Sequence, residues 1–296
     1  MFPPRLLRQP GPARACRLEI VQGDAVRLDF PLRQDATLHD ALVTPLIQAG
    51  FQSATVRFSA AALNPFRYVR PAPAADDRHV AYFSAPHAPQ GTSRIEVAQA
   101  TFGFNQGAPA VHCHAVWVEP DGSRRGGHIL PVETVLAEPA QATAHGFRDI
   151  RIETRPDPET NFPLFTPAGG TPGGRAVVAR VAPNLDILTA VETVAARLGI
   201  RDAAILGTLG SLIGACFTTG AQVADHATEV LVREGFIRDG TAALDLLAVD
   251  MQGRVHEGWL AHGQNPVCIT FDLVLEDLER DDRRQNCPRS ESRDQT

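Results

Sequence analysis

The stretch VHCHAVWVEPDGSRRGGHIL, residues 111–130, has the form of two strands joined by a turn. Alternate residues of a strand share a face, so His112 and His114 are expected to point the same way. A hairpin centred on Asp121 places His128 directly opposite His114. The stretch therefore predicts three imidazoles on one patch of a sheet.

This register sets a condition on the turn. A two-residue Asp-Gly turn would send His128 to the opposite face, so the hairpin needs an odd-numbered loop or a bulge, for which Gly126-Gly127 is a candidate. Histidine is the commonest protein ligand of zinc and similar divalent metals, and three ligands leave one coordination position open for a substrate or ligand. We predict a divalent metal, zinc in the first place, on His112, His114 and His128. The alternative is that they are partly exposed polar residues, because His-x-His also occurs by chance.

The region around this hairpin recurs later in the chain. A helical pattern that opens at Thr37 and stops at Gly50 returns after Asn184 and stops at Gly199, an offset of 149 residues. The hairpins correspond at an offset of 131 residues, which aligns Asp121 with Gln252. We interpret the chain as an internal duplication.

The strands before the two hairpins are also similar, although at another offset. Ile95-Glu96-Val97 matches Thr228-Glu229-Val230 at an offset of 133 residues, which leaves 16 extra residues in the first copy. The extra piece includes residues 71–77, a Pro/Ala/Asp-rich segment expected to form a loop. A long ordered loop of this kind is more often functional than structural.

The second copy lacks the histidines. Ala243, Asp245 and Trp259 occupy the positions of His112, His114 and His128 at the hairpin offset. The fold itself therefore does not require imidazoles there. We expect the second copy to be a degenerate partner of the first.

Proline and glycine mark the boundary between the copies. We predict a first domain over residues 1–150, a Pro/Gly-rich linker over 151–175, a second domain over 176–278, and a polar, disordered tail over 279–296.

Four further residues are weaker candidates for ligand binding. Glu133 follows the hairpin and would be a fourth metal ligand or general base if the backbone folds it inward. Arg67 and Arg70 border the extra loop, where a pair of guanidinium groups could hold a small anion. Glu96 recurs as Glu229 at a strand start, which fits either a carboxylate facing a shared site or a paired edge residue. Recurrence in a copy without histidines favours the structural role.

Composition excludes several functions. The chain has 296 residues, a net charge of −6 and 28 basic residues, all of them arginine. Without lysine, Schiff-base chemistry and the lysine of a phosphate-binding loop are excluded. The five scattered cysteines suit a reducing cytoplasm, and no apolar run predicts a membrane helix. The acidic balance disfavours DNA as a partner, because phosphate contacts dominate that affinity.

These motifs resemble the PPC domain, "plants and prokaryotes conserved". The resemblance lies in Ile95-Glu96-Val97, His112-Cys113-His114 and the return Gly126-Gly127-His128, over residues 36–145, and in a second copy over 176–278 without the histidines. It implies an α/β fold of the α+β type: two duplicated domains, each a mostly antiparallel sheet flanked by helices.

The resemblance also implies assembly and ligands. Prokaryotic members form homotrimers with the three histidines near a subunit interface, often holding a metal, so a trimer of this chain would be a pseudo-hexamer. Plant members carry a DNA-binding hook, which this sequence lacks. Two functions stay open: a site for a divalent metal or small ligand, with or without catalysis, and a DNA-associated regulatory or scaffolding protein acting through its oligomer.

Overall fold

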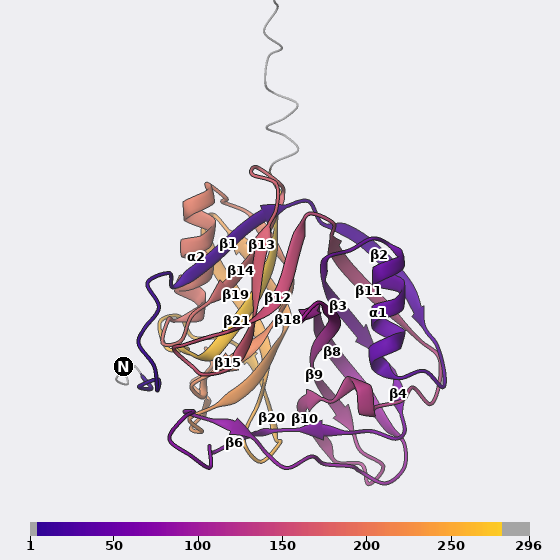
Figure 1. Cartoon of the computed structure of the whole chain (residues 1–296). Coiled ribbons are helices and arrows are strands. Elements are labelled where there is room, and N and C mark those ends of the chain that lie inside the picture. The colour runs from indigo at the N-terminus through magenta and orange to yellow at the C-terminus, as the bar shows by residue number, and fades with distance from the viewer. Residues whose placement is uncertain (1–4, 280–296) are drawn as a thin grey trace, which may run out of the picture.

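A computed structural model describes residues 5–279, which form two sheets that lie face to face, with one helix on the outer side of each (Figure 1). Helix α1 (Leu38–Gln48) covers the first sheet and helix α2 (Ile187–Leu198) covers the second. The prediction of an α+β, sheet-dominated fold is confirmed. No helix within residues 5–279 is long and apolar enough to cross a membrane.

The first sheet has the main strand order β2-β11-β3-β8-β9-β10-β5, and β4 and β12 also pair with β8. Its strands are β2 (Val26–Leu32), β3 (Ser53–Ser59), β4 (Ala62–Leu63), β5 (Tyr68–Val69), β8 (Ser93–Asn105), β9 (Ala108–Val118), β10 (Arg124–Ile129), β11 (Ala140–Phe147), β12 (Ile150–Pro156) and β13 (Pro163–Gly169).

The second sheet has the strand order β1-β14-β21-β15-β18-β19-β20. Its strands are β1 (Leu18–Gly23), β14 (Ala176–Val181), β15 (Ala203–Leu212), β18 (Thr228–Arg238), β19 (Thr241–Val249), β20 (Val255–Trp259) and β21 (Val267–Asp277). Two small ribbons, β6 (Pro71–Ala72) with β7 (Tyr82–Phe83) and β16 (Ala215–Cys216) with β17 (Gln222–Val223), and the 3₁₀ turn η1 (Pro131–Glu133) complete the elements.

Six strands of each sheet follow the same order. The run β2-β11-β3-β8-β9-β10 in the first sheet has the counterpart β14-β21-β15-β18-β19-β20 in the second, and each helix follows the first strand of its run. The central hairpins also share their register, since His114 pairs with His128 and Asp245 pairs with Trp259. The two halves thus have the same topology as well as similar sequences.

Local signals in the sequence explain where the helices begin and end. The Thr37 side chain caps α1 by accepting a hydrogen bond from the Asp40 N–H, and the Asp186 side chain caps α2 in the same way. Helix α2 ends at Gly199, whose φ of 67° is a left-handed conformation that glycine adopts without strain.

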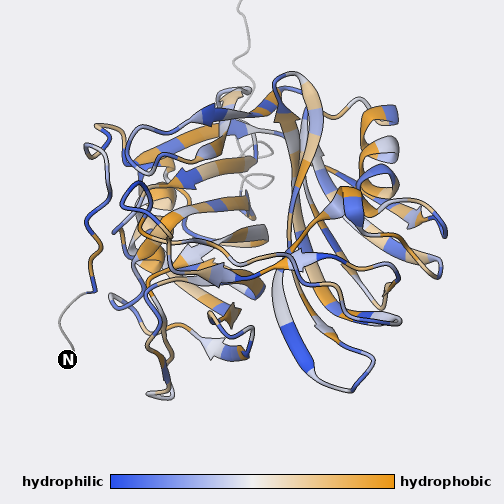
Figure 2. Ribbon diagram, turned by 60° about the horizontal axis from the view of Figure 1, so that its bottom comes forward, coloured by the Kyte–Doolittle hydropathy of each residue, from blue (hydrophilic) through white to orange (hydrophobic). Residues whose placement is uncertain are grey.

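Alternation along β9 divides its side chains between two environments. Cys113, Ala115 and Trp117 join the core beneath α1, whereas Val116 packs between the sheets against Leu231 of the second half. Figure 2 shows apolar segments through the strands of both sheets and hydrophilic segments at the loops. Because His112 and His114 share the face of Val116, they point into the space between the sheets.

The chain crosses between the halves at two places where the sequence predicted otherwise. Strand β1 falls within the predicted first domain, residues 1–150, but it pairs antiparallel with β14 of the second sheet. The predicted linker, 151–175, is largely an antiparallel hairpin of β12 and β13. Pro156 and Pro163 pair at the end next to the turn, and Pro167 lies inside β13, which within residues 5–279 pairs with β12 alone and is therefore an edge strand that tolerates proline. The predicted tail lies, apart from Glu279, outside the described residues.

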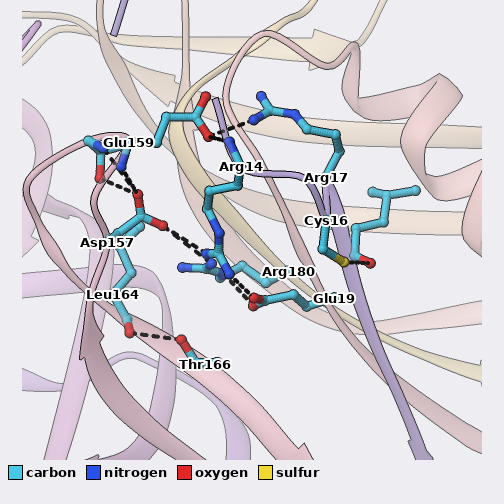
Figure 3. Close-up of polar contacts among 11 residues, drawn as sticks. Arg14, Cys16, Arg17, Glu19, Asp157, Glu159, Leu164, Thr166 and Arg180 are labelled. Atoms are coloured by element: carbon cyan, nitrogen blue, oxygen red, sulfur yellow. Dashed lines mark hydrogen bonds and ion pairs between the residues drawn. The ribbon is translucent and has the colours of Figure 1, made fainter. Parts of the chain in front are cut away.

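Ion pairs fasten the N-terminal segment to this hairpin (Figure 3). Arg14 contacts Asp157 at 2.8 Å and also pairs with Glu19, and Arg17 contacts Glu159 at 2.5 Å. Asp157 and Glu159 are buried in the turn between β12 and β13. The network therefore fixes the hairpin over one end of the space between the sheets.

Candidate metal site between the two sheets

The three histidines converge as the sequence predicts. His114 lies directly opposite His128 in the β9–β10 pair. The ring centroid of His112 lies 4.7 Å from that of His114 and 4.8 Å from that of His128. One nitrogen from each ring lies within 4.8 Å of the other two. This spacing is small enough for a single metal ion to be coordinated by all three rings.

The turn achieves this register with a five-residue loop, 119–123, between Val118 and Arg124. The predicted odd loop is therefore present, and the β9–β10 ladder has no bulge at Gly126-Gly127. Instead, both glycines lie where neighbouring atoms approach the backbone too closely to leave room for a side chain. A Cβ on Gly126 would lie 2.5 Å from Val249 of the second half, and one on Gly127 would lie 2.5 Å from the Val69 carbonyl oxygen.

A hydrogen bond orients the imidazole of His114, whereas one nitrogen of His128 has no hydrogen-bond partner among the described residues. The Nδ1 of His114 lies 3.0 Å from the Val230 carbonyl oxygen, so it carries the proton and donates. Its Nε2 is then free to accept, 3.0 Å from the Nε2 of His112. The Nδ1 of His128 is buried and has no partner among the described residues. A buried nitrogen that lacks a partner among the described residues, beside two other imidazoles, has the chemistry of a metal ligand.

Burial keeps these rings neutral. Burial lowers the pKa of His114 to about 4, although the Val230 carbonyl opposes this, and burial followed by the proximity of His114 lowers the pKa of His128 to about 3. The pKa of His112 is also well below its usual value, by burial and then by the other two rings. All three are therefore unprotonated near pH 7, the state in which imidazole binds a metal.

The triad forms part of the wall of a cavity of about 480 Å³, a size typical of small-molecule sites. The β7 ribbon and the β12–β13 hairpin supply aromatic side chains, and the second sheet supplies carboxyl and hydroxyl groups. The lining residues that matter most are Tyr82, Phe83, Phe162, Phe165, Ser211, Thr228, Glu229, Thr270 and Asp272.

Two carboxyl groups face this cavity from the second half, that of the buried Glu229 and that of the half-buried Asp272. The Oε1 of Glu229 lies 3.9 Å from Nε2 of His114, and its Oε2 has no partner among the described residues. Burial raises the pKa of Glu229 to about 8. Burial, followed by the charge of Glu19, raises the pKa of Asp272 to about 7. The second half thus brings two weak acids to the three bases of the first.

The other sequence candidates lie away from the triad. Glu133 forms an ion pair with Arg67 at 3.2 Å, so the backbone does not fold it inward. Arg70 donates to His87 at 3.1 Å and to the Gln252 carbonyl oxygen. None of these three predicted residues lines the cavity.

Glu96 and Glu229 differ in a way the sequence alignment did not reveal. Val118 and Val249 correspond in the two hairpins, but Val118 pairs with Arg94 and Val249 pairs with Glu229. Glu229 therefore occupies the position of Arg94. Glu96 lies at a register shift, is exposed, and contacts Arg124 at 2.8 Å. Recurrence in the sequence favours a structural role for Glu229, and only the packing of one sheet on the other places it beside His114.

Comparison with known proteins gives a family for the second half. Residues 169–279 match the Plants and Prokaryotes Conserved (PCC) domain. No curated protein matches the sequence.

Solved structures with similar folds each cover about half of this chain. A plant- and prokaryote-conserved protein from Pyrococcus horikoshii is 15% identical, with a TM-score of 0.40, over 49% of this chain and 96% of its own. A metal-containing protein from Archaeoglobus fulgidus is 14% identical, with a TM-score of 0.40, over 49% and 96%. A "putative DNA-binding protein" from Bacteroides thetaiotaomicron is 13% identical, with a TM-score of 0.36, over 47% and 90%. The family match therefore applies to residues 169–279, which contain helix α2 and the second sheet from β14 to β21.

Proposed function

We propose that this protein binds a divalent metal ion through His112, His114 and His128 and presents the ion to a small molecule in the cavity. The observation that carries the proposal is the convergence of three neutral imidazoles, one with an unpaired buried nitrogen, on a cavity of about 480 Å³. Three nitrogen ligands suit zinc and leave a position for a ligand oxygen.

In this proposal the two halves have different roles at the site. The first half holds the ion, and the Val230 carbonyl fixes the tautomer of His114 from the second half, as partners of metal-bound histidines commonly do. When bound, such an ion polarises a ligand oxygen or lowers the pKa of water. Glu229 is the nearest carboxyl group, 3.9 Å from His114, and is placed to exchange a proton with a group held there.

The test is bound metal per chain on untagged protein. We expect one ion per chain in the wild type and almost none in the double variant His112→Ala, His128→Ala. The control is His256→Ala, His262→Ala, because these histidines lie in the second half and contact Asp250 and Glu192 at 2.9 Å. Thermal unfolding of each variant confirms that it folds. Wild-type protein without metal after zinc dialysis, or a double variant that retains it, would overturn the proposal.

We further propose that the two halves arose by duplication, with domains over 1–150 and 176–278. The matching strand order and hairpin register support this origin. Because β1 and the β12–β13 hairpin interlock the halves, the first half should not fold alone. A fragment of residues 1–150 that unfolds as cooperatively as the whole chain would contradict that interlocking.

Two expectations from the resemblance have their own tests. The homotrimer predicts a sedimentation mass three times that of the chain, whereas a clean monomer would remove it. The DNA-associated alternative predicts a salt-dependent shift on duplex DNA, and no binding at low salt would remove it.

A further inference from the structure

The cavity contains a row of polar groups that leads away from the histidines. Ser211 on β15 pairs with Glu229 on β18, and its hydroxyl oxygen accepts a hydrogen bond of 3.0 Å from the Ile269 N–H on β21. Thr270, the next residue, also lines the cavity. Neighbouring strands lie about 4.8 Å apart, so the row extends about 10 Å from Glu229 to Thr270.

The two ends of this row lack partners. The hydroxyl oxygen of Thr270 and one carboxyl oxygen of Glu229 are buried and make no hydrogen bond with the described residues. Their residues are only 9% and 5% exposed. Most buried polar groups in proteins are paired, so two unpaired groups at the ends of this row, both lining one cavity, indicate a ligand with a polar atom for each.

Aromatic side chains line the same cavity. The ring centroid of Phe83 lies 5.2 Å from that of His128, in an edge-to-face arrangement. The ring centroid of Phe165 lies 6.5 Å from that of His112. Tyr82 stacks on Phe162 at 5.6 Å. Rings placed at these separations are suited to stacking or edge contact with another aromatic ring.

The charges of the residues that line the cavity limit the kind of ligand that it can bind. No arginine within residues 5–279 lines the cavity, and the chain has no lysine. A phosphate or other dianion would therefore find no guanidinium or ammonium group to pair with. A single negative charge could be balanced by a metal ion on the histidines.

We propose that the cavity binds a flat aromatic monocarboxylate about 10 Å long, with its carboxylate at the three histidines and a hydroxyl group at Thr270. This inference rests on the proposed metal site, because the ion supplies the charge that meets the carboxylate. The ring lies under Phe83 and Phe162, and the far hydroxyl group pairs with the unpartnered Thr270 oxygen.

The probe is 4-hydroxyphenylacetate, titrated calorimetrically into protein whose zinc content has first been measured. Phenylacetate lacks the far hydroxyl group, phenyl phosphate replaces the monoanion by a dianion, and 4-hydroxycyclohexylacetate replaces the flat ring. We expect the probe to bind about tenfold more tightly than phenylacetate, since one hydrogen bond to a buried group is worth about 1.4 kcal/mol, a tenfold change. It should also bind more tightly than phenyl phosphate, whose second charge finds no guanidinium group, and than 4-hydroxycyclohexylacetate, which cannot make aromatic ring contacts.

The variant Thr270→Val tests the far end. It should weaken the probe about tenfold and leave phenylacetate unchanged, because phenylacetate makes no contact there. The matched control is Thr208→Val, since Thr208 is also buried, with a hydroxyl group that has no partner within residues 5–279, but does not line the cavity. It should change neither affinity.

The outcomes separate the two proposals. Protein that takes up no zinc refutes the metal site. Zinc-loaded protein that fails to bind the probe, binds phenyl phosphate or the saturated ring equally well, or responds equally to both threonine variants refutes the ligand assignment and leaves the metal site standing.

Discussion

Strands β9 and β19 have the same place in their sheets and present the same face to the space between them, but they fill that face differently. On β19, Asp245 contacts the Arg233 guanidinium at 2.7 Å, so its charge is compensated. At the equivalent position on β9, His114 meets two other imidazoles, and His128 keeps an unpaired nitrogen. The fold therefore needs this face to be filled, but it does not need histidine to fill it.

The largest expected difference between the halves concerns their tryptophans. Trp117 is fully buried, with ring centroids 4.9 Å from Phe66 and 4.5 Å from Tyr68. Trp259, at the position of His128, is only partly buried and lies 5.7 Å from Phe236. Urea unfolding should show that Trp117→Ala costs about 3–5 kcal/mol and Trp259→Ala about 1 kcal/mol. Equal losses would mean that the second half also depends on its hairpin tryptophan.

Metal should stabilise the whole molecule through the first half. Zinc at about 100 times its Kd should raise the free energy of unfolding by about 2.7 kcal/mol, measured by denaturant titration with and without a chelator. The double variant His112→Ala, His128→Ala should lose this increment. Trp259→Ala should keep it, because Trp259 stands at the position of His128 in the half that lacks the three histidines. An increment that survives the double variant would place the ion elsewhere.

The two halves also place groups with opposite pKa shifts at the cavity, so their contributions to stability change with pH in opposite directions. The pKa values of the histidines are lowered, so their contribution to stability is lost as the pH falls below about 6.5. The pKa of Asp272 is raised to about 7. Its contribution is complete below its unfolded pKa of about 3.9 and is lost as the pH rises through about 7.

Replacing the Asp272 carboxyl group should therefore remove the loss of stability that the wild type shows as the pH rises. In metal-free protein, Asp272→Asn should gain about 2–3 kcal/mol relative to the wild type between pH 5 and pH 8, since each pKa unit is worth about 1.4 kcal/mol. The histidine contributions are common to both proteins and cancel in the difference. Asp77→Asn, at an exposed loop aspartate, is the control and should run parallel to the wild type. A constant difference between Asp272→Asn and the wild type would show that Asp272 is ionised in the folded state throughout.

The triad was predictable from the sequence because all its geometry is local. Alternation places His112 with His114, and the centre of a single hairpin places His128, so one register decides all three. Helix ends were equally local, as the caps Thr37 and Gly199 show.

The rest of the site depends on contacts between distant strands. Glu229 lies 115 residues from His114 in the sequence and reaches it only because the second sheet packs against the first. Proline and glycine in 151–175 predicted a linker, yet these residues close a hairpin whose Phe165 faces the cavity. Local composition carries no information about which sheet a segment will cover, so the cavity could not be derived from the sequence.

The smallest effect tests the opening comparison most directly. Asp245 is buried and its partner Arg233 is partly exposed, so Asp245→Ala should cost about 1–2 kcal/mol, less than a fully buried pair because the arginine regains water. In metal-free protein, His128→Leu should cost nothing or stabilise, because it removes a buried nitrogen that has no partner among the described residues. Urea unfolding in the presence of a chelator measures both. A loss for His128→Leu as large as that for Asp245→Ala would mean that the first half, like the second, holds its polar face for the sake of the fold.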